Sequence, residues 1–156
     1  MKKLLFLLLA LPLLMVSCDD DDNFPKVQLK IDGSGGVTHE GYIYLLQGDT
    51  LSIDSIGIVS AESTSGVKIT GANYYLDYRP VWSTVVAPFG YKLETGTLAT
   101  GSHILEIQCP VLAVGYSPAV AFVSYQLRIV DSEDDMPSSS DSTSVSGSFL
   151  SEIKGQ

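Results

Sequence analysis

The chain has 156 residues, of which 45% are hydrophobic, and carries a formal net charge of −9 at pH 7. This length suits one domain with tails. The chain is acidic and has no cluster of Lys and Arg, so we expect no nucleic-acid partner.

The first residues have the layout of an export signal. Lys2 and Lys3 are followed by an apolar run over 4–14, which is too short to span a bilayer core that needs ~20 residues. We therefore expect residues 1–17 to be a secretory signal peptide. The run ends in Met15-Val16-Ser17-Cys18. This sequence resembles the lipobox of bacterial lipoproteins, and the resemblance implies cleavage before Cys18 and lipidation of that residue. The alternative is an ordinary cleaved signal peptide with a chance cysteine.

Four aspartates follow the cysteine directly: Asp19, Asp20, Asp21 and Asp22. This run resembles the surface-export signal of Bacteroidota lipoproteins. The resemblance implies a lipid anchor in the outer membrane with the protein facing outward, and the periplasmic face is the alternative. The run also suits a plain spacer, because like charges repel and keep a chain extended. We expect 18–25 to form a lipidated acidic tether.

Residues 26–131 are expected to fold. Apolar residues alternate with polar ones or form short runs between Gly, Pro and Ser, and no helical spacing extends over ten residues. Gly33–Gly36 is expected to end the first strand. The expected strands are 26–32, 42–46, 51–59, 67–70, 73–79, 81–87 as an edge between two prolines, 91–98, 103–111 and 119–130.

A tyrosine-rich segment lies in the middle of this region. In a single strand over 73–79, alternation directs one set of side chains to the core, namely Tyr74, Leu76 and Tyr78. The other set faces outward. Exposed aromatic rings stack on sugar rings, so one hypothesis is a glycan-contacting patch made of Tyr75, Asp77, Arg79 and Trp82. The other hypothesis is that the aromatic side chains pack in the core.

The last two strands carry the clearest pattern. Leu105, Ile107, Cys109 and Val111 share one face, as do alternate residues from Ala121 to Ile129, and a short Gly/Pro connection suggests an antiparallel hairpin. The run 98–107 resembles the penultimate strand of bacterial immunoglobulin-like domains. The expected fold is therefore an all-β, single antiparallel immunoglobulin-like β-sandwich with disordered tails. If Cys18 carries lipid, Cys109 has no partner, and its thiol is then either reactive or buried. Its place in an apolar strand favours a buried thiol, and we expect no disulfide.

The composition changes after residue 131. Acidic residues lead into a Ser-rich tract, so we expect 132–156 to be a disordered tail.

Few residues could support catalysis or metal binding. The chain has two histidines, His39 and His103. A zinc site would need carboxylates besides these histidines and one cysteine. The segment Asp32-Gly33-Ser34-Gly35-Gly36 has the residue types of the serine motif of trypsin-like proteases, but in a different order. We therefore expect no catalytic site, no metal site and no cofactor.

Together these patterns predict a lipid-anchored cell-surface protein that acts by binding or as a structural accessory, with an unknown protein or glycan partner. A glycan-binding accessory of a polysaccharide uptake system is the alternative, and an enzyme is the third class. As a whole, the chain resembles the small uncharacterised surface lipoproteins of Bacteroidota.

Overall fold

The structure is a computed structural model that describes residues 27–60, 66–138 and 143–152. Its elements are ten strands and two short 3₁₀ turns, and none of the described residues is in an α-helix. The described part of the chain also has no helix that could cross a membrane. The predicted signal peptide and the predicted tether, with Cys18 and the four aspartates, lie outside the described residues. The elements are β1 (Val27–His39), β2 (Tyr42–Leu46), β3 (Thr50–Ser60), β4 (Val67–Ile69), β5 (Ala72–Leu76), β6 (Arg79–Thr84), β7 (Tyr91–Glu94), η1 (Thr95–Thr97), β8 (Gly101–Ala113), β9 (Ala119–Val130), η2 (Glu133–Asp135) and β10 (Thr143–Glu152).

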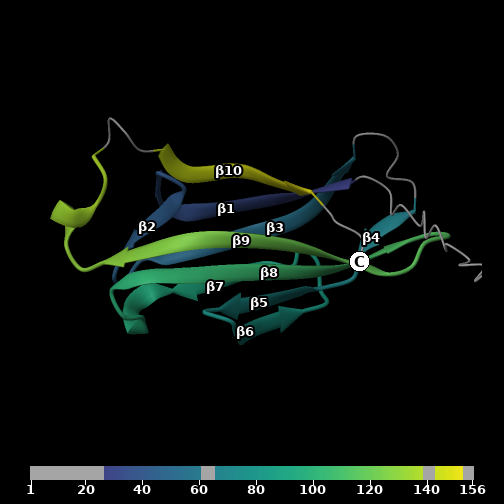
Figure 1. Ribbon diagram of the computed structural model, residues 1–156, viewed down its shortest axis with the longest axis horizontal. Helices are drawn as coiled ribbons and strands as arrows, with labels where there is room; N and C mark the ends of the chain where they lie inside the picture. Colours follow the sequence, from purple (N-terminus) through teal and green to yellow (C-terminus); the bar gives the residue numbers. More distant parts are fainter. Residues whose placement is uncertain (1–26, 61–65, 139–142, 153–156) are drawn as a thin grey trace, which may run out of the picture.

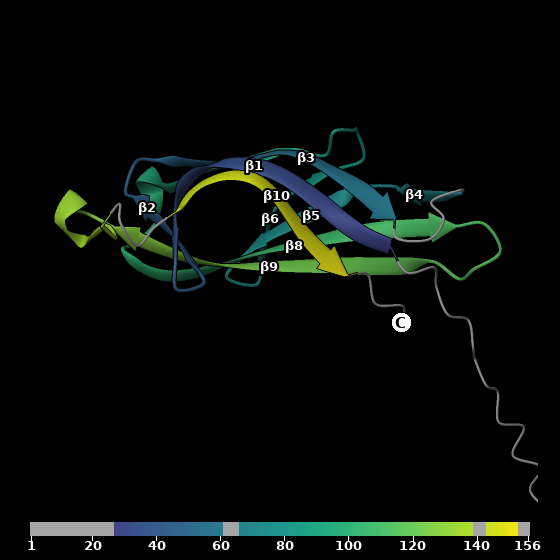
Figure 2. The same cartoon turned by 90° about the horizontal axis from the view of Figure 1, so that it is seen from above.

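The strands form two layers, which Figures 1 and 2 show from two sides. One layer has the order β6-β5-β8-β9-β2, with the short β4 paired to the end of β8, and the other has the order β10-β1-β3-β7. Among the described strands, neighbours are antiparallel except β2 and β9, which pair in parallel. Two face-to-face sheets that exchange strands along the chain make an immunoglobulin-like sandwich. The predicted fold class is confirmed.

The core lies between the two layers and follows the predicted alternation. Every second residue of β8 from Leu105 to Val111 is buried, and Cys109 among them has no exposed surface. Strands β8 and β9 pair as a long antiparallel hairpin from Gly101↔Ile129 to Val111↔Ala119, as predicted. The other large hydrophobic side chains that are fully buried come from both layers and are Tyr74, Leu29, Ile31, Leu45, Leu51, Leu127 and Ile129.

Strand β1 continues through Gly33–Gly36, so the prediction that these glycines end the first strand is wrong. Glycines are needed there because neighbouring backbone comes very close. A Cβ atom on Gly33 would lie 2.5 Å from the carbonyl oxygen of Ser52, and Gly36 has a φ of +76°. Beyond these glycines β1 bends and pairs with β2, so this strand connects the two layers.

The tyrosine-rich segment is a hairpin, so the prediction of a single strand over 73–79 is wrong. Asp77 and Tyr78 both have positive φ, of 48° and 64°, and they reverse the chain between β5 and β6. Tyr74 and Leu76 are buried as predicted, but Tyr78 sits at the tip of the turn with 72% of its surface exposed. Strand β6 ends the strand order of its layer, as predicted for a segment bounded by prolines.

The C-terminal region differs from the expected tail without structure. Residues Thr143–Glu152 form β10, which pairs antiparallel with β1 from Gln28↔Glu152 to Thr38↔Thr143. The physical reason is that β1 offers unpaired N–H and C=O groups along one edge, and this segment contains β-forming Thr, Val and Phe residues among its serines. Residues 139–142 and 153–156 lie outside the described residues.

Candidate ligand-binding groove

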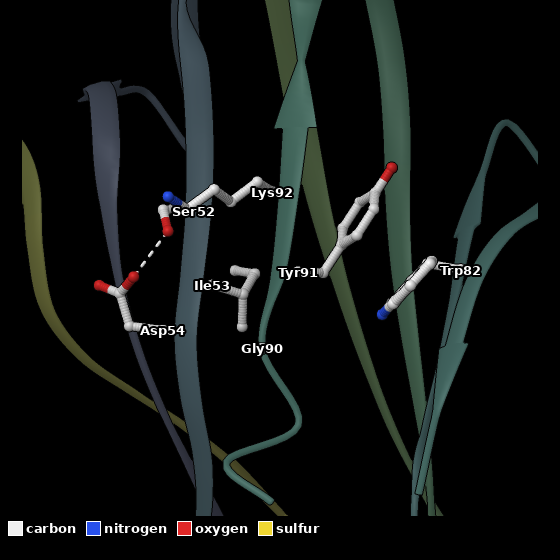
Figure 3. Close-up of a pocket in the computed structure, with 7 residues that line it drawn as sticks. All are labelled: Ser52, Ile53, Asp54, Trp82, Gly90, Tyr91 and Lys92. Atoms are coloured by element: carbon white, nitrogen blue, oxygen red, sulfur yellow. Dashed lines mark hydrogen bonds between the residues drawn. The ribbon is translucent and has the colours of Figure 1, made fainter. Parts of the chain in front are cut away.

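An open groove of about 460 Å³ lies where the edges of the two layers face each other, between β3 and β7 on one side and β6 on the other. Figure 3 shows the side chains that surround it. The lining residues are Ser52, Ile53, Asp54, Trp82, Gly90, Tyr91 and Lys92. Residues 52–54 of β3 lie about thirty residues before Trp82 of β6 and the segment 90–92 at the start of β7, so the groove exists only in the folded domain.

Trp82 forms one wall of the groove and is held there by stacking. Its ring lies almost parallel to that of Tyr91, with centroids 6.4 Å apart and an angle of 18° between the planes. Tyr91 in turn packs against the buried ring of Tyr74, at a centroid distance of 4.8 Å. Three aromatic rings therefore run from the core to the surface, and the last of them keeps 51% of its surface exposed.

The register of the β5–β6 hairpin places Trp82 in this position. Trp82 lies opposite Tyr74, and cross-strand partners in an antiparallel pair point to the same face. Because Tyr74 points into the core, Trp82 is also directed toward the space between the layers, at the exposed edge. The register shifts between Tyr74 and Tyr75, so alternation along the sequence could not reveal this orientation.

The segment before β7 is fixed by the core. The hydroxyl of Tyr74 donates a buried hydrogen bond to the carbonyl oxygen of Phe89, with 2.6 Å between the oxygens. Gly90 then passes close to β3: a Cβ atom there would lie 2.8 Å from the carbonyl oxygen of Ile53. These contacts set the position of Tyr91, which begins β7.

The opposite rim of the groove is polar. Asp54 is the extra residue of β3 at the bulge opposite Asp32 and Gly33, and bulges change the direction in which a side chain points. Its carboxylate accepts a hydrogen bond from the Ser52 hydroxyl at 2.6 Å. Lys92 lies directly across from Ser52 on β7, so an acceptor and a cation share this rim (Figure 3). Burial raises the pKa of Tyr91, so its hydroxyl stays protonated at neutral pH.

The four residues proposed to contact a glycan do not form one patch. Trp82 alone lines the groove. Tyr75 is half-buried and lies between Pro80 and Glu106 on the other face of its sheet, Asp77 lies in the turn, and Arg79 begins β6. Sequence reasoning missed Tyr91, Asp54 and Lys92. The one local signal was the aromatic residue at the start of the strand over 91–98.

His103 and Asp77 form a clamp between the β5–β6 turn and the start of β8. The His103 Nδ1 atom lies 2.7 Å from Asp77 Oδ2, and Nε2 lies 2.8 Å from the Ala99 carbonyl oxygen. Both partners are acceptors, so both ring nitrogens must donate, and this geometry requires the charged imidazolium. The other carboxylate oxygen of Asp77 accepts from the Ile104 N–H at 3.0 Å.

The pKa values of the two groups follow from this geometry. Burial alone lowers the pKa of His103, but the hydrogen bonds to Asp77 and Ala99 outweigh it, so the pKa is raised above 6.5. Burial alone raises the pKa of Asp77, but its bonds to His103 and Ile104 outweigh it, so the pKa falls below 3.8. The pair is therefore charged at mildly acidic pH.

Cys109 is a core side chain, as predicted. It is fully buried, and burial raises the pKa of its thiol to about 12. A thiol with this pKa holds very little thiolate at neutral pH and is a poor nucleophile. Among the described residues, no three or more His, Cys, Asp or Glu side chains gather as they would around a metal ion.

A second hollow of about 550 Å³ lies where β9 ends, at the other end of the sandwich from the β8–β9 turn. Its lining is mainly polar, and it includes Tyr44, Thr100, Gly101, Arg128, Ile129, Val130, Asp131 and Asp135. The Arg128 guanidinium donates to the Ser102 hydroxyl at 3.0 Å, so part of its hydrogen-bonding capacity is used within the chain. We therefore regard the Trp82 groove as the stronger candidate site.

No protein-family model matches the chain, and no curated protein matches it in sequence. Among solved structures, the chain is similar to the fibronectin(III)-like modules of Clostridium thermocellum CbhA, with a TM-score of 0.35 and 17% identity. The match covers 60% of this chain and 94% of that one. At this TM-score the similarity carries no weight for function, and the fold assignment rests on the strand order and pairing given above.

Proposed function

We propose that this chain is a lipid-anchored cell-surface protein that binds a ligand without catalysing a reaction, and that the Trp82 groove is its binding site. The anchor would be Cys18, within the lipobox-like Met15–Cys18, and Asp19–Asp22 would direct the protein to the outer face of the outer membrane. The membrane and the ligand are then its two partners. This is the surface lipoprotein type that the leader resembles.

The exposed Trp82 ring carries the proposal for the site. Tryptophan has the largest side chain, and about half of the surface of Trp82 remains exposed although its ring stacks on Tyr91. An exposed aromatic ring held rigid by stacking loses little entropy when a ligand covers it. Such positions are typical of binding sites, where rigid aromatics supply contact area.

The groove favours a carbohydrate ring as ligand. One face of a pyranose is apolar and stacks on an indole, while its hydroxyls need hydrogen-bond donors and acceptors around the rim. Asp54 can accept from a hydroxyl, Lys92 can donate to one, and Ser52 can do either. One aromatic wall and a rim with both a carboxylate and an ammonium group support the hypothesis that the chain binds a glycan.

The side chains most suited to catalysis are occupied elsewhere. His103 donates from both ring nitrogens within the Asp77 clamp, so it has no free lone pair to act as a base. Cys109 is buried and protonated. These observations support a binding role for the domain.

The test of the site is titration of the mature chain with soluble polysaccharides, following Trp82 emission and its quenching by acrylamide. Trp82 is the one tryptophan of the chain, so the signal has a single source. We expect a ligand to shift the emission to the blue and to protect it from quenching. Calorimetry should show that Trp82→Ala weakens binding by about 2 kcal/mol, or about thirtyfold in Kd.

Tyr75→Ala is the matched control for Trp82→Ala. It removes an aromatic ring from the neighbouring strand, but from the outer face of the sheet, away from the groove. We expect it to leave the Kd unchanged. Loss of binding in Tyr75→Ala with retention in Trp82→Ala would place the site on the outer face and refute the groove.

The anchor is tested separately with Cys18→Ala. This substitution should release the protein from the membrane fraction, because without lipid the tether has no anchoring group. Mass spectrometry of the wild-type protein that finds no acyl group on Cys18 would contradict lipidation at this residue.

A further inference from the structure

The turn of the β8–β9 hairpin exposes apolar side chains that the groove does not use. Val114, at the turn, has 83% of its surface exposed, and Tyr116 beside it is also exposed. Leu112 and Phe122 add exposed apolar surface on the adjoining parts of the two strands. No Asp, Glu, Lys or Arg occurs between Glu106 and Arg128, so the whole end of the hairpin is free of charge.

This hairpin tip lies at the end of the sandwich where the described chain begins. Val27, the first residue of β1, pairs with Ser60 at the end of β3, and β4 pairs with the last residues of β8 through Val67↔Ala113. Figures 1 and 2 agree that the start of β1, the end of β3, β4 and the hairpin tip share one end of the molecule.

The length of the chain before Val27 limits how far this end can be from the anchor. Nine residues lead from Cys18 to Val27. Fully extended, they reach about 30 Å, at roughly 3.3–3.6 Å per residue. An acyl chain on Cys18 would therefore hold Val27 within that distance of the lipid surface, and Val27 lies at the end of the molecule that carries the apolar tip.

We infer that the β8–β9 tip is a second membrane contact, and that Val114 and Tyr116 insert into the headgroup region of the bilayer that holds the anchor. The inference rests on the lipid anchor of the proposed function. Uncharged apolar residues with a tyrosine suit this region, where tyrosine places its ring in lipid and its hydroxyl in water. Weak membrane contacts act together when a single chain carries both, and two signals hold a protein far better than one.

Contact at the tip would orient the domain and keep the groove in water. Ile53 in the groove lies six residues before Val59, close to the tip end of β3, so the two are about 20 Å apart at 3.3 Å per residue. The domain would stand upright, with the groove on its side and the β5–β6 turn at Tyr78 directed away from the lipid.

The test uses the full lipidated chain in phosphatidylethanolamine–phosphatidylglycerol vesicles that contain brominated phosphatidylcholine as a quencher. Val114→Trp places a fluorophore at the tip. Tyr78→Trp is the matched control, because that residue is similarly exposed but follows Leu76, which pairs with Leu105 in the half of β8 away from the tip. Trp82 gives the same background in both variants. Both changes affect exposed side chains, and an unchanged Tm shows that the variants fold.

We expect Val114→Trp to shift to the blue and lose emission in brominated vesicles, and Tyr78→Trp to do neither. Equal emission of the two variants, on protein that mass spectrometry shows to carry lipid, would overturn the tip contact and leave the anchor intact. Quenching of Val114→Trp on protein without lipid would support the tip contact and refute the anchor. Protein that carries no lipid and shows no quenching of Val114→Trp would refute both the anchor and the tip contact.

Discussion

The hydrogen bond from Tyr74 to Phe89 is the contact that links the core to the groove, so its removal gives the most informative test of the structure. Tyr74→Phe deletes the hydroxyl and leaves the ring, which continues to pack against Tyr91. The change leaves the Phe89 carbonyl oxygen in the core region without the donor that it has in the native protein.

The magnitude follows from the burial of this pair. An ordinary hydrogen bond contributes about 1 kcal/mol net, but a buried group left without its partner costs about 1–3 kcal/mol. Tyr74 is fully buried and its bond is short, at 2.6 Å, so we expect the free energy of unfolding to fall by about 2 kcal/mol. At roughly 4 °C per kcal/mol for a domain of this size, the Tm should fall by about 8 °C.

Urea denaturation of the wild-type protein and Tyr74→Phe gives the difference in the free energy of unfolding. Tyr78→Phe is the control, because it makes the same chemical change on an exposed residue at the tip of a turn. We expect the control to change stability by less than about 0.5 kcal/mol. An equal effect of the two substitutions, or no effect of Tyr74→Phe, would refute the role of this hydrogen bond.

Two further predictions concern the clamp and the groove. Because the pKa of His103 is raised, this group contributes fully to the free energy of unfolding below pH 6.5, and its contribution is lost as the pH rises through the folded pKa. Because the pKa of Asp77 is lowered, its contribution is present above pH 3.8 and is lost as the pH falls through the folded pKa. Melting curves across pH should therefore show the largest stabilisation by the clamp between pH 3.8 and 6.5. His103→Gln should remove the fall in Tm above this range. A fall in Tm that is unchanged in His103→Gln would contradict a stabilising role for the charged imidazolium. Gly90→Ala should lower the free energy of unfolding, measured by urea denaturation, by about 1–3 kcal/mol, because the new methyl group would clash with the Ile53 carbonyl oxygen. In the comparison variant Gly41→Ala the methyl group meets no neighbour, so this variant measures only the backbone strain of a positive φ.

The β8–β9 hairpin could be predicted from the sequence because its information is local. Alternating apolar residues over two long strands, with Gly and Pro between them, specify which face is buried and how the strands pair. Cys109 falls on the buried face of that pattern, so its burial was predictable as well.

The β5–β6 turn could not be predicted in the same way. Asp-Tyr is not one of the glycine- or asparagine-containing pairs that usually occupy two positive-φ positions of a tight hairpin. The clamp helps to fix Asp77, through His103 and the backbone of Ile104, and both partners lie far along the chain. Tertiary contacts therefore selected a turn for which the local sequence gave no signal.

The groove could not be predicted from the local sequence either. The sequence indicates Trp82 as a candidate because exposed aromatic rings can stack on sugar rings. Its stacking on Tyr91 depends on how the edges of two sheets meet, and the position of Asp54 depends on a bulge against β1. Neither feature leaves a pattern within one strand.

The pairing of β1 with β10 has a consequence for how the chain folds. Gln28 lies opposite Glu152, so the first strand of the domain is bonded to the last strand of the described chain. Contacts between residues so far apart in sequence form slowly, because a large loop must close before they gain any energy. If the chain is exported with its N-terminus first, as we propose, the edge of β1 stays exposed until residues 143–152 emerge. During that interval β1 could accept residues 143–152 of another copy, because that segment offers the same pairing as the native one.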